Sequence, residues 1–538
     1  MRSIVATFLF FSIINVSYAQ IHEIIFEKNR IHQLLNPESP RNSFLFRNFP
    51  DISNSIVLSD SVADLRRNQG VLKIEPLFFT FKSTPHRPFS SPDGMLLPIS
   101  GNQGYLSQGI TFNKGILSIS LRPEVVLGHT TNYQSISRDF SDEIIEDKYY
   151  FYNSGDHPEE FKKQAFARFW WGQSKISLKF KSFEFGASTE NIWWGPGQWN
   201  SLIFAQNASG FAHLTLNTTK PAKTFLGNFE GQFLVGRLES SNQLPTQNQE
   251  WNDRFFRPLP EEWRYINAIN FSYSPKWIPN LFLGFSRTVQ LYNNFLGDQF
   301  LDYFPIFQAL QKEKYFENGN SVAFDQKNQS QQVAVYGRIV IPKSKSELYF
   351  EFGRRDHAFN WRDFTLNPEH ARAFNIGFIQ LFELSESRKI FQLRGEITQQ
   401  LESVNRYVRY SLKGGDAWHT NEQARGFTQF GQPMGVGIGI GSNVQNLEFS
   451  LIEEFDKIGL LFQRIENQQA FYYRAFLMDD QVKPWIDLSL GFLYDKKFEN
   501  LLVSSKLQVI HARNYQWQLD PASTSDFPKG QNLTSVMG

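Results

Sequence analysis

The sequence predicts an all-β fold, a transmembrane antiparallel β-barrel of about 18 strands with a small, partly helical N-terminal segment. Aromatic residues make up 16% of the 538 residues, although the mean hydropathy is only −0.38. This combination is typical of many amphipathic strands and not of a soluble helical core. Two further patterns support the barrel: a period-two alternation of apolar and polar residues, and an alternation of short turns with long connections.

The period-two alternation is strict in several segments. In "NLEFSL", the apolar Leu447, Phe449 and Leu451 alternate with Glu448 and Ser450. The segments "KIFQLRGEIT", "WIDLSLGFLY" and "ISLKFKS" repeat the pattern. Half-buried strands show this period, but those of a soluble β-sandwich show it as well.

The lengths of the connections favour a barrel over a sandwich. Short turns such as "SPKWIPN", "PKSKSE" and "LSESRK" alternate with long connections around 293–330, 356–372 and 402–433. Outer-membrane barrels have this asymmetry, with short periplasmic turns and long outer loops. The predicted barrel, with its long extracellular loops, covers residues 71–538.

The N-terminus predicts export. Arg2 precedes the apolar run "IVATFLFFSIINV", and Ser17 and Ala19 form a small-x-small cleavage site before Gln20. We interpret residues 1–19 as a cleaved signal peptide, because the run is shorter than the roughly 20 residues that a bilayer-spanning helix needs. No second apolar run of that length follows, so a membrane-embedded mature chain requires a closed barrel.

Residues 20–70 lack the alternation of the strands. Ser59 is a candidate N-cap for a helix in "SDSVADLRR". We interpret this region as a partly helical segment that packs on the periplasmic side or plugs that mouth of the barrel. A flexible leader is the alternative.

Composition and motifs exclude several functions. The 54 Lys and Arg residues balance 53 Asp and Glu, so no basic face for nucleic acid is expected. The chain has no cysteine, which excludes a disulfide framework, a thiolate metal site and a cysteine nucleophile. HExxH, G-x-S-x-G and Walker motifs are absent, and adjacent acids in a strand point to opposite faces, so we expect no catalysis and no cofactor.

Two other motifs have simpler interpretations. The acidic run at 139–147 does not have the spacing of an EF-hand, so we expect a solvated outer loop and no metal site. The segment "GVGIGIG" superficially resembles a nucleotide-binding loop, but its period is two. We expect a barrel strand there, with Val436, Ile438 and Ile440 facing lipid.

Three loops rich in aromatic, amide, His and Arg side chains are the candidate binding surface. Such side chains suit sugars, which offer hydroxyl groups and an apolar C–H face. The alternative for each tryptophan is the aromatic girdle at the membrane interface. The first loop, 83–98, contributes His86, Arg87 and Asp93; the third, 414–433, contributes Trp418, His419, Gln423 and Arg425.

The second loop contains "NIWWGPGQWNSLIF". Pro196 cannot donate to a strand ladder, so Trp193, Trp194 and Trp199 flank a turn. Alternation does not resume until Phe211, whereas a girdle residue normally has a regular strand beyond it. This irregularity favours a specialised loop, in which we expect the three tryptophans mostly to brace the structure.

The chain resembles the Wzi-type capsule-assembly family of Gram-negative outer-membrane proteins, in the form common among Bacteroidota. The resemblance rests on "EPLFFTFKSTPHRPFSSPDGMLLPISGNQGYLSQGI", "GILSISLRPEVV", "NIWWGPGQWNSLIFAQNASGFAHLTLNTTKP" and "NLLVSSKLQVIHARNYQWQL", and it covers nearly the whole mature chain. The third piece is long and specific. The matched signature residues are Trp193, Trp194, Gly195, Pro196, Gly197, Asn207, Gly210, Phe211 and His213, with Trp199 in the same loop.

The resemblance implies a barrel of about 18 strands, occluded by its loops, with a lectin-like role in holding or organising surface polysaccharide. Such barrels normally finish on an aromatic residue that the insertion machinery reads. Here the sequence reads "KGQNLTSVMG", which predicts an incomplete last strand or a different closure.

The sequence therefore predicts a non-catalytic outer-membrane barrel that binds capsular polysaccharide or exopolysaccharide and assists its assembly or attachment. Its other expected partners are outer-membrane lipid and the barrel-insertion machinery. A porin or solute channel is the first alternative, with Arg394, Glu396, Glu448 and Lys506 lining a water path. A barrel enzyme that acts on lipid or glycan is a third.

Overall fold

The structure is a computed structural model that describes most of the chain. The described residues are 19–36, 43–47, 70–91, 93–159, 161, 164–308, 310, 328–355, 365–366, 371–384, 388–401, 417–476, 479 and 481–538. Nearly all of the expected signal peptide, and the expected helix N-cap Ser59, lie outside these residues.

The described strands form a closed barrel of antiparallel strands. Four wall strands are each interrupted by a few residues, and counting each of them once gives 18 wall strands, which confirms the predicted number. They are β2 (Val71–Ile74) with β3 (Phe78–Thr84), β4 (Gly101–Ser107) with β5 (Ile110–Lys114), β6 (Leu117–Leu121) with β7 (Glu124–Thr130), β8 (Phe166–Trp170) with β9 (Lys175–Phe180), β10 (Phe183–Ser188), β12 (His213–Thr218), β14 (Gly227–Leu238), β15 (Arg264–Pro275), β16 (Leu281–Tyr292), β17 (Ser330–Ile341), β18 (Ser346–Arg355), β19 (Arg372–Glu383), β20 (Ile390–Gln399), β23 (Asn443–Glu453), β24 (Asp456–Glu466), β25 (Ile486–Lys497), β26 (Leu502–Arg513) and β27 (Leu533–Met537).

The first and last wall strands meet at one backbone pair. The Ser83 N–H donates to the Gly538 carbonyl at 2.7 Å, and the Gly538 N–H donates to the Ser83 carbonyl at 3.1 Å. On its other side β27 pairs with β26 from Gln508 to Ala512. The short strand β27 thus completes the ring, with partners on both edges.

The alternation along the wall is that of a membrane barrel, with apolar side chains outside and polar side chains inside. On β23, Leu447 and Leu451 are exposed while Glu448 and Ser450 are fully buried. On β25, Leu488 and Leu490 are exposed and Asp487 is buried. A soluble sandwich would bury the apolar face instead, so the burial pattern resolves the ambiguity of the sequence.

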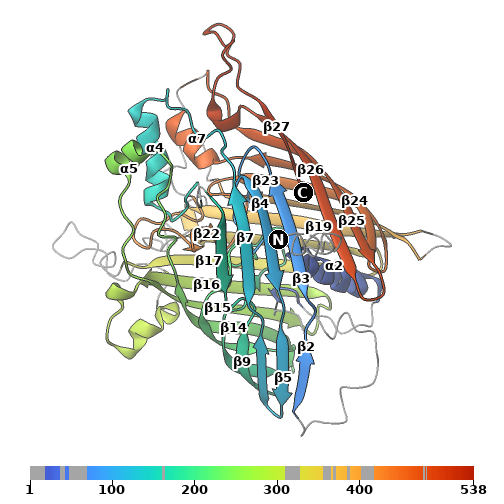
Figure 1. The fold of residues 1–538 in the computed structure, drawn as a ribbon. Helices are drawn as coiled ribbons and strands as arrows, with labels where there is room; N and C mark the ends of the chain where they lie inside the picture. The colour runs from blue at the N-terminus through green and yellow to red at the C-terminus, as the bar shows by residue number, and fades with distance from the viewer. Residues whose placement is uncertain are drawn as a thin grey trace, which may run out of the picture.

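The two ends of the barrel differ as the connection lengths predict. One end has short turns, and the other carries the helices α4 (Asp142–Asn153), α5 (Gln249–Phe255) and α7 (Gln469–Ala475) (Figure 1). The 3₁₀ helices are η1 (Asn293–Phe295), η2 (Phe300–Tyr303), η3 (Pro305–Phe307) and η5 (Tyr515–Trp517), and the remaining short strands are β1 (Phe46–Arg47), β11 (Trp193–Trp194), β13 (Ala222–Lys223), β21 (Thr428–Gln429) and β22 (Gln432–Pro433). Over the described residues, the helices are all too short or too polar to cross a bilayer.

The barrel interior is filled. Helix α2 (Ala19–Leu35) lies inside the barrel (Figure 1), where Glu27 forms an ion pair with Lys457 of β24 at 2.9 Å and Arg30 pairs with Glu347 of β18. Residues of α2, of the long loops and of the inner strand faces share one apolar core, which includes Leu34, Trp194 and Trp418. A second apolar cluster lies under α4 and α7 at the long-loop end.

Leu490→Arg tests the assignment of the outer face. Leu490 lies near the middle of β25 and points outward, so a charge there is expected to destabilise the barrel by about 2–4 kcal/mol in a bilayer. The free energy of unfolding in lipid vesicles measures the loss. Phe527→Arg, in an exposed loop at the long-loop end, is the matched control and is expected to change it by less than about 0.5 kcal/mol. Equal losses in both variants would contradict a lipid-facing β25.

Candidate functional site

The signature segment, residues 191–213, passes through the barrel interior between β10 and β12. Its Trp193 and Trp194 form β11, which pairs with β1. Both indoles are buried, and Trp194 Nε1 donates to Gln232 Oε1 of β14 at 2.9 Å. The Trp194 ring also meets the Phe204 ring edge-on at 4.7 Å. These two tryptophans therefore lie in the packed interior, away from the membrane interface.

A buried carboxylate of the wall holds the turn of this segment. Glu396 of β20 is only 1% exposed and accepts three consecutive backbone N–H groups, from Gln198 at 2.5 Å, Trp199 at 3.2 Å and Asn200 at 2.8 Å. Tyr349 of β18 donates its hydroxyl to the same carboxylate at 2.7 Å. Hydrogen bonds to a charged acceptor are stronger than neutral ones, and they satisfy backbone donors that water cannot reach.

A second wall carboxylate holds the residues on either side. Glu351 of β18 accepts from the Gly197 N–H at 3.0 Å and the Leu202 N–H at 2.9 Å. The Ser201 hydroxyl also lies 3.3 Å from this carboxylate. Together, the two glutamates fix residues 197–202 against the wall.

The Gly-Pro-Gly sequence fits this close approach. Gly195 has φ +116°, and a Cβ there would lie 2.5 Å from Glu351 Oε1. At Gly197 a Cβ would lie 1.8 Å from the Asn200 carbonyl oxygen. Only glycine allows both the backbone conformation and the contact with the carboxylate.

Helix α2 contacts the same turn from inside the barrel. The Arg30 guanidinium donates to the Pro196 carbonyl at 2.7 Å and pairs with Glu347, which also forms an ion pair with Arg338 at 2.7 Å. All three charged side chains are nearly inaccessible to solvent. The turn is thus held between the wall and the N-terminal helix.

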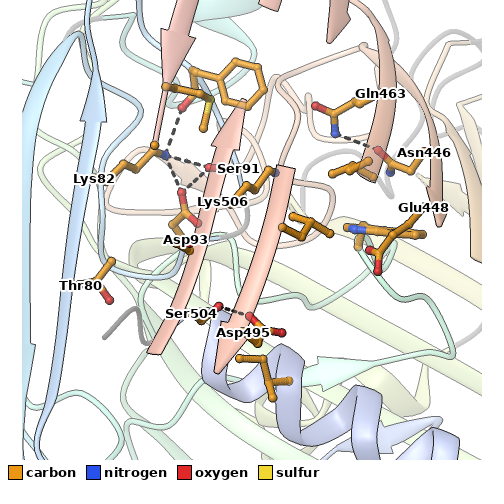
Figure 2. A pocket seen from close by; sticks show the side chains of 18 of the residues that line it. Thr80, Lys82, Ser91, Asp93, Asn446, Glu448, Gln463, Asp495, Ser504 and Lys506 are labelled. Carbon is orange, nitrogen blue, oxygen red and sulfur yellow. Dashed lines mark hydrogen bonds and ion pairs between the residues drawn. The ribbon is translucent and has the colours of Figure 1, made fainter. Parts of the chain in front are cut away.

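An inner cavity of about 130 Å³ lies between α2, the signature segment and the wall strands β3 and β23–β26. Its polar side chains approach one another from several elements, including Lys82, Ser91 and Asp93 on one side (Figure 2). The charged lining residues are Glu27, Lys82, Asp93, Arg394, Glu448, Lys457, Asp495 and Lys506.

The charges of this inner cavity are largely paired. Lys457 lies 2.9 Å from Glu27 and 3.3 Å from Glu448, and Arg394 lies 2.5 Å from Glu448. The Arg394 guanidinium also lies over the Trp199 ring, 4.5 Å from its centre. Trp199, which is half-buried, is thus the signature tryptophan that borders this cavity.

A second cavity of about 180 Å³, the loop-end cavity, lies under α4 and α7 at the long-loop end. Trp485, Tyr515 and Tyr152 are among the aromatic residues that line it. The Arg87 guanidinium makes a two-pronged contact with Asp487 at 2.8 and 3.0 Å, and it lies 5.8 Å from the ring centres of both Trp485 and Tyr515.

Further polar groups of the loop-end cavity are also held in place. Trp485 Nε1 donates to Asp487 Oδ1 at 2.8 Å. Lys148 of α4 forms an ion pair with Glu159 at 3.0 Å. Phe89, Ser90 and Ile438 line both cavities, so these three residues separate the loop-end cavity from the inner cavity.

The sequence-predicted residues of the first and third loops fall in different surroundings. Arg87 lines the loop-end cavity, Asp93 lines the inner cavity, and His86 and Gln423 are exposed. The buried Arg425 donates to the carbonyl of Arg257 at 2.6 Å.

Trp418 and His419 are fully buried inside the barrel. Trp418 Nε1 donates to the Leu202 carbonyl at 2.7 Å, which joins the third loop to the signature segment. Burial lowers the pKa of His419 to about 3, so its ring is neutral at physiological pH.

The end of the signature segment is equally enclosed. Asn207 Nδ2 donates to the Pro433 carbonyl at 2.7 Å, and His213 Nδ1 lies 2.8 Å from the Phe211 carbonyl. A Cβ at Gly210 would lie 2.0 Å from the Thr189 carbonyl oxygen. These residues pack the interior and do not line either of the two cavities.

The interpretation of "GVGIGIG" as a lipid-facing strand is wrong. Residues 435–441 form turns inside the barrel, where Val436 is fully buried and Ile438 separates the two cavities. A Cβ at Gly435 would lie 2.1 Å from the Leu202 carbonyl oxygen, and one at Gly437 would lie 2.5 Å from Asn207 Oδ1. The glycines thus permit close packing on the signature segment, which a period-two pattern does not reveal.

The side chains expected to line a water path have other roles. Glu396 holds the signature turn, Arg394 and Glu448 pair with each other, and Lys506 borders the inner cavity. In the described part of the barrel, α2 and the long loops occupy the space that a porin would leave open.

Sequence reasoning missed the aromatic residues of the loop-end cavity. Trp485 comes immediately before a well-patterned strand, and Tyr152 lies in a segment without a recognisable motif. Tyr515 lies in the last of the pieces that carry the family resemblance, but nothing in that piece singled it out as a binding residue. A local sequence indication of this cavity is "WID", in which the inward-pointing Asp487 lies two residues after Trp485 at the long-loop end.

Comparisons with known proteins agree on family and fold. Residues 114–469 match the family model for the capsule assembly protein Wzi. The Wzi protein of Escherichia coli is an outer-membrane protein involved in group 1 capsule assembly and a carbohydrate-binding β-barrel. Its structure matches with a TM-score of 0.55 at 12% identity, over 97% of this chain and 98% of that one.

Other solved structures are more distant. OccK5 (OpdH) of Pseudomonas aeruginosa matches with a TM-score of 0.38 at 10% identity, over 87% of this chain and 96% of that one. A BenF-like porin from Pseudomonas fluorescens matches with a TM-score of 0.36 at 8% identity, over 87% and 98%. No curated protein matches the chain.

Glu396→Gln tests the anchoring of the signature turn. The amide keeps the shape but presents one acceptor oxygen to donors that a carboxylate satisfied, so we expect a loss of about 2–3 kcal/mol in the free energy of unfolding. Faster cleavage of the signature segment by protease should accompany the loss. Glu383→Gln, which removes an exposed partner of Lys345, is the control and is expected to have an effect below about 0.5 kcal/mol. Equal losses in the free energy of unfolding for the two variants would contradict the anchoring of the turn by Glu396.

Proposed function

The chain belongs to the Wzi capsule assembly family, and on this premise we propose that it binds a surface polysaccharide at the long-loop end of an outer-membrane barrel. In doing so it assists the assembly or attachment of capsule or exopolysaccharide. The action is reversible binding without catalysis. The observation that carries the proposal is the loop-end cavity, with its aromatic walls and fixed polar groups.

The aromatic walls suit a sugar ring. The indole of Trp485 and the phenol rings of Tyr515 and Tyr152 offer flat apolar faces to the C–H face of a sugar. Each such side chain has only two side-chain torsions, so little conformational entropy is lost when a ligand orders it. Binding pockets commonly combine such apolar walls with a few convergent polar groups.

The polar groups are positioned before any ligand arrives. Arg87 and Asp487 hold each other through two hydrogen bonds, and Lys148 is held by Glu159. Groups fixed in this way add specificity for hydroxyl or acidic substituents at a low ordering cost. Both pairs are neutral overall, so these four side chains give the cavity no net charge and suit a neutral sugar unit.

The signature segment supports this cavity indirectly. Glu351 and Glu396 fix residues 197–202, and Trp418 joins the third loop to them. We infer that Trp193 and Trp194 brace the loops and that the sugar contacts lie in the loop-end cavity. Outer-membrane lipid surrounds the wall, and the insertion machinery acts on the chain during biogenesis.

Deletion of the gene tests the cellular role. Loss of a polysaccharide-binding barrel is expected to shift polysaccharide from the cell-bound to the released fraction, because the surface then lacks a point of attachment. The ratio of the two fractions, measured in the wild type, the deletion strain and a complemented strain, reports the shift. An unchanged ratio would refute the proposed role.

Trp485→Ala tests the loop-end cavity itself. Loss of this aromatic face is expected to weaken binding of the organism's own purified polysaccharide at least about tenfold, or about 1.4 kcal/mol. Titration calorimetry on the refolded barrel measures the affinity, and the heat-dependent gel mobility of the barrel verifies its fold. Trp277→Ala, in an exposed short turn at the opposite end, is the matched control. If a folded Trp485→Ala variant and this control bind the polysaccharide with equal affinity, the sugar binds outside the loop-end cavity.

A further inference from the structure

Three polar side chains on the outer face of the wall are buried, although their direction is toward the membrane. Asn267 of β15, Arg287 of β16 and Gln331 of β17 alternate with inward residues, and each is at most 5% exposed. Outward neighbours farther along the same strands, such as Phe271 and Val335, are 45% and 44% exposed. Something other than lipid therefore covers the polar group.

The cover is the segment 293–308, which contains η1, η2 and η3. Arg287 Nη1 donates to the carbonyls of Ile306 at 2.8 Å and Gln308 at 2.5 Å, and its Nε donates to Gln331 Oε1 at 2.7 Å. The Ile306 N–H donates to Asn267 Oδ1 at 3.1 Å. A guanidinium facing hydrocarbon would be costly, and these bonds satisfy it against protein backbone instead.

The other side of this cover is rich in exposed aromatic and aliphatic side chains. They are Phe295, Phe300, Leu301, Tyr303 and Phe307, and Phe300 is 76% exposed. The polar Asn294, Asp298 and Gln299 of the segment are exposed as well. The Phe307 ring stacks on that of Phe233, an outward residue of β14, with centres 6.0 Å apart and planes at 12°. The apolar face of the cover is thus continuous with the outer surface of the wall. Figure 1 shows the yellow-green segment at the left edge of the barrel, beside β14, β15 and β16.

The height of the cover matches the edge of the bilayer core. Ile341, at the short-turn end of β17, is ten residues from Gln331, about 34 Å at roughly 3.4 Å per residue. A strand tilted by about 40° rises about 26 Å over that length, and the apolar band of outer-membrane barrels is about 25 Å tall. The covered polar group therefore lies where hydrocarbon gives way to headgroups on the long-loop side.

We propose that the segment 293–308 is a membrane-interface anchor, whose aromatic face enters the outer-leaflet lipid at the boundary between acyl chains and headgroups. Aromatic and aliphatic side chains on a segment with a polar opposite face favour this boundary. The anchor fixes the depth and tilt of the barrel on one side, and it does so independently of polysaccharide binding.

Single-cysteine labelling tests the anchor, because the chain contains no cysteine of its own. Phe300→Cys and Phe307→Cys each receive a nitroxide label, and the barrel is placed in phosphatidylcholine vesicles. Collision with molecular oxygen, which concentrates in lipid, is compared with collision with a water-soluble nickel chelate. The matched controls are labels at Leu490→Cys on the lipid-facing β25 and at Phe527→Cys in an exposed loop at the long-loop end.

Labels at positions 300 and 307 are expected to collide with oxygen more than with the nickel chelate. Their oxygen-to-nickel collision ratios should be several-fold above the ratio at position 527 and close to the ratio at position 490. A ratio like that at position 527 would show that the segment faces water and overturns the anchor. Low collision with both reagents, with dipolar broadening between labels, would show a second copy of the chain on this face and also overturns it.

The wall side of the segment provides a second measurement. Arg287→Gln removes the donors that bind the Ile306 and Gln308 carbonyls and leaves the strand ladder intact. The oxygen-to-nickel ratio at position 300 is then expected to fall, while that at position 490 stays constant. An unchanged ratio at position 300 in a folded variant would contradict the role of Arg287 in holding the anchor.

Discussion

The interior of this barrel depends on two carboxylates that accept backbone hydrogen bonds. Glu351 and Glu396 point from adjacent regions of the wall into a turn that cannot form regular secondary structure. Five described backbone N–H groups between Gly197 and Leu202 donate to them. Buried donors of this kind are rarely left without an acceptor. The loops over the turn therefore have a fixed base on which to pack.

Polar groups of the wall also hold other parts of the interior in place. Helix α2 brings Glu27 and Arg30 to wall residues of opposite charge, and the inner cavity is bordered by ion pairs and not by free charges of one sign. A water-filled pore would keep such groups solvated, whereas here they hold an N-terminal helix and several loops inside the ring. The protein thus uses the polar inner face of a membrane barrel as the surface on which a second, irregular layer folds. The loop-end cavity is a product of that layer.

The sequence alone predicts the strands of the wall, but it does not predict how the loops pack in the interior. Alternation in segments such as 447–451 predicts which residues face lipid, because the period of two is a local property of a strand. The alternation also predicts correctly that Glu396 points inward. The sequence around Glu396 does not reveal that it accepts hydrogen bonds from residues 198–200 of a distant turn. The period of two in residues 435–441 led to the wrong prediction of a strand, because the glycines of this segment permit close tertiary packing. Trp193 and Trp194 were recognisable as a constructed loop, but their burial depends on contacts with β1 and β14.

The contact between the signature turn and β20 also constrains the order in which the molecule is built. Glu396 accepts the backbone N–H of Gln198, which lies 198 residues earlier in the sequence. The strands between these two residues make up a large part of the ring. Until β20 joins the wall, the turn lacks the Glu396 carboxylate that accepts its central N–H groups. The turn therefore reaches its final set of hydrogen bonds only after β20 is in place. A contact between residues so far apart in sequence joins the interior to the wall late in folding.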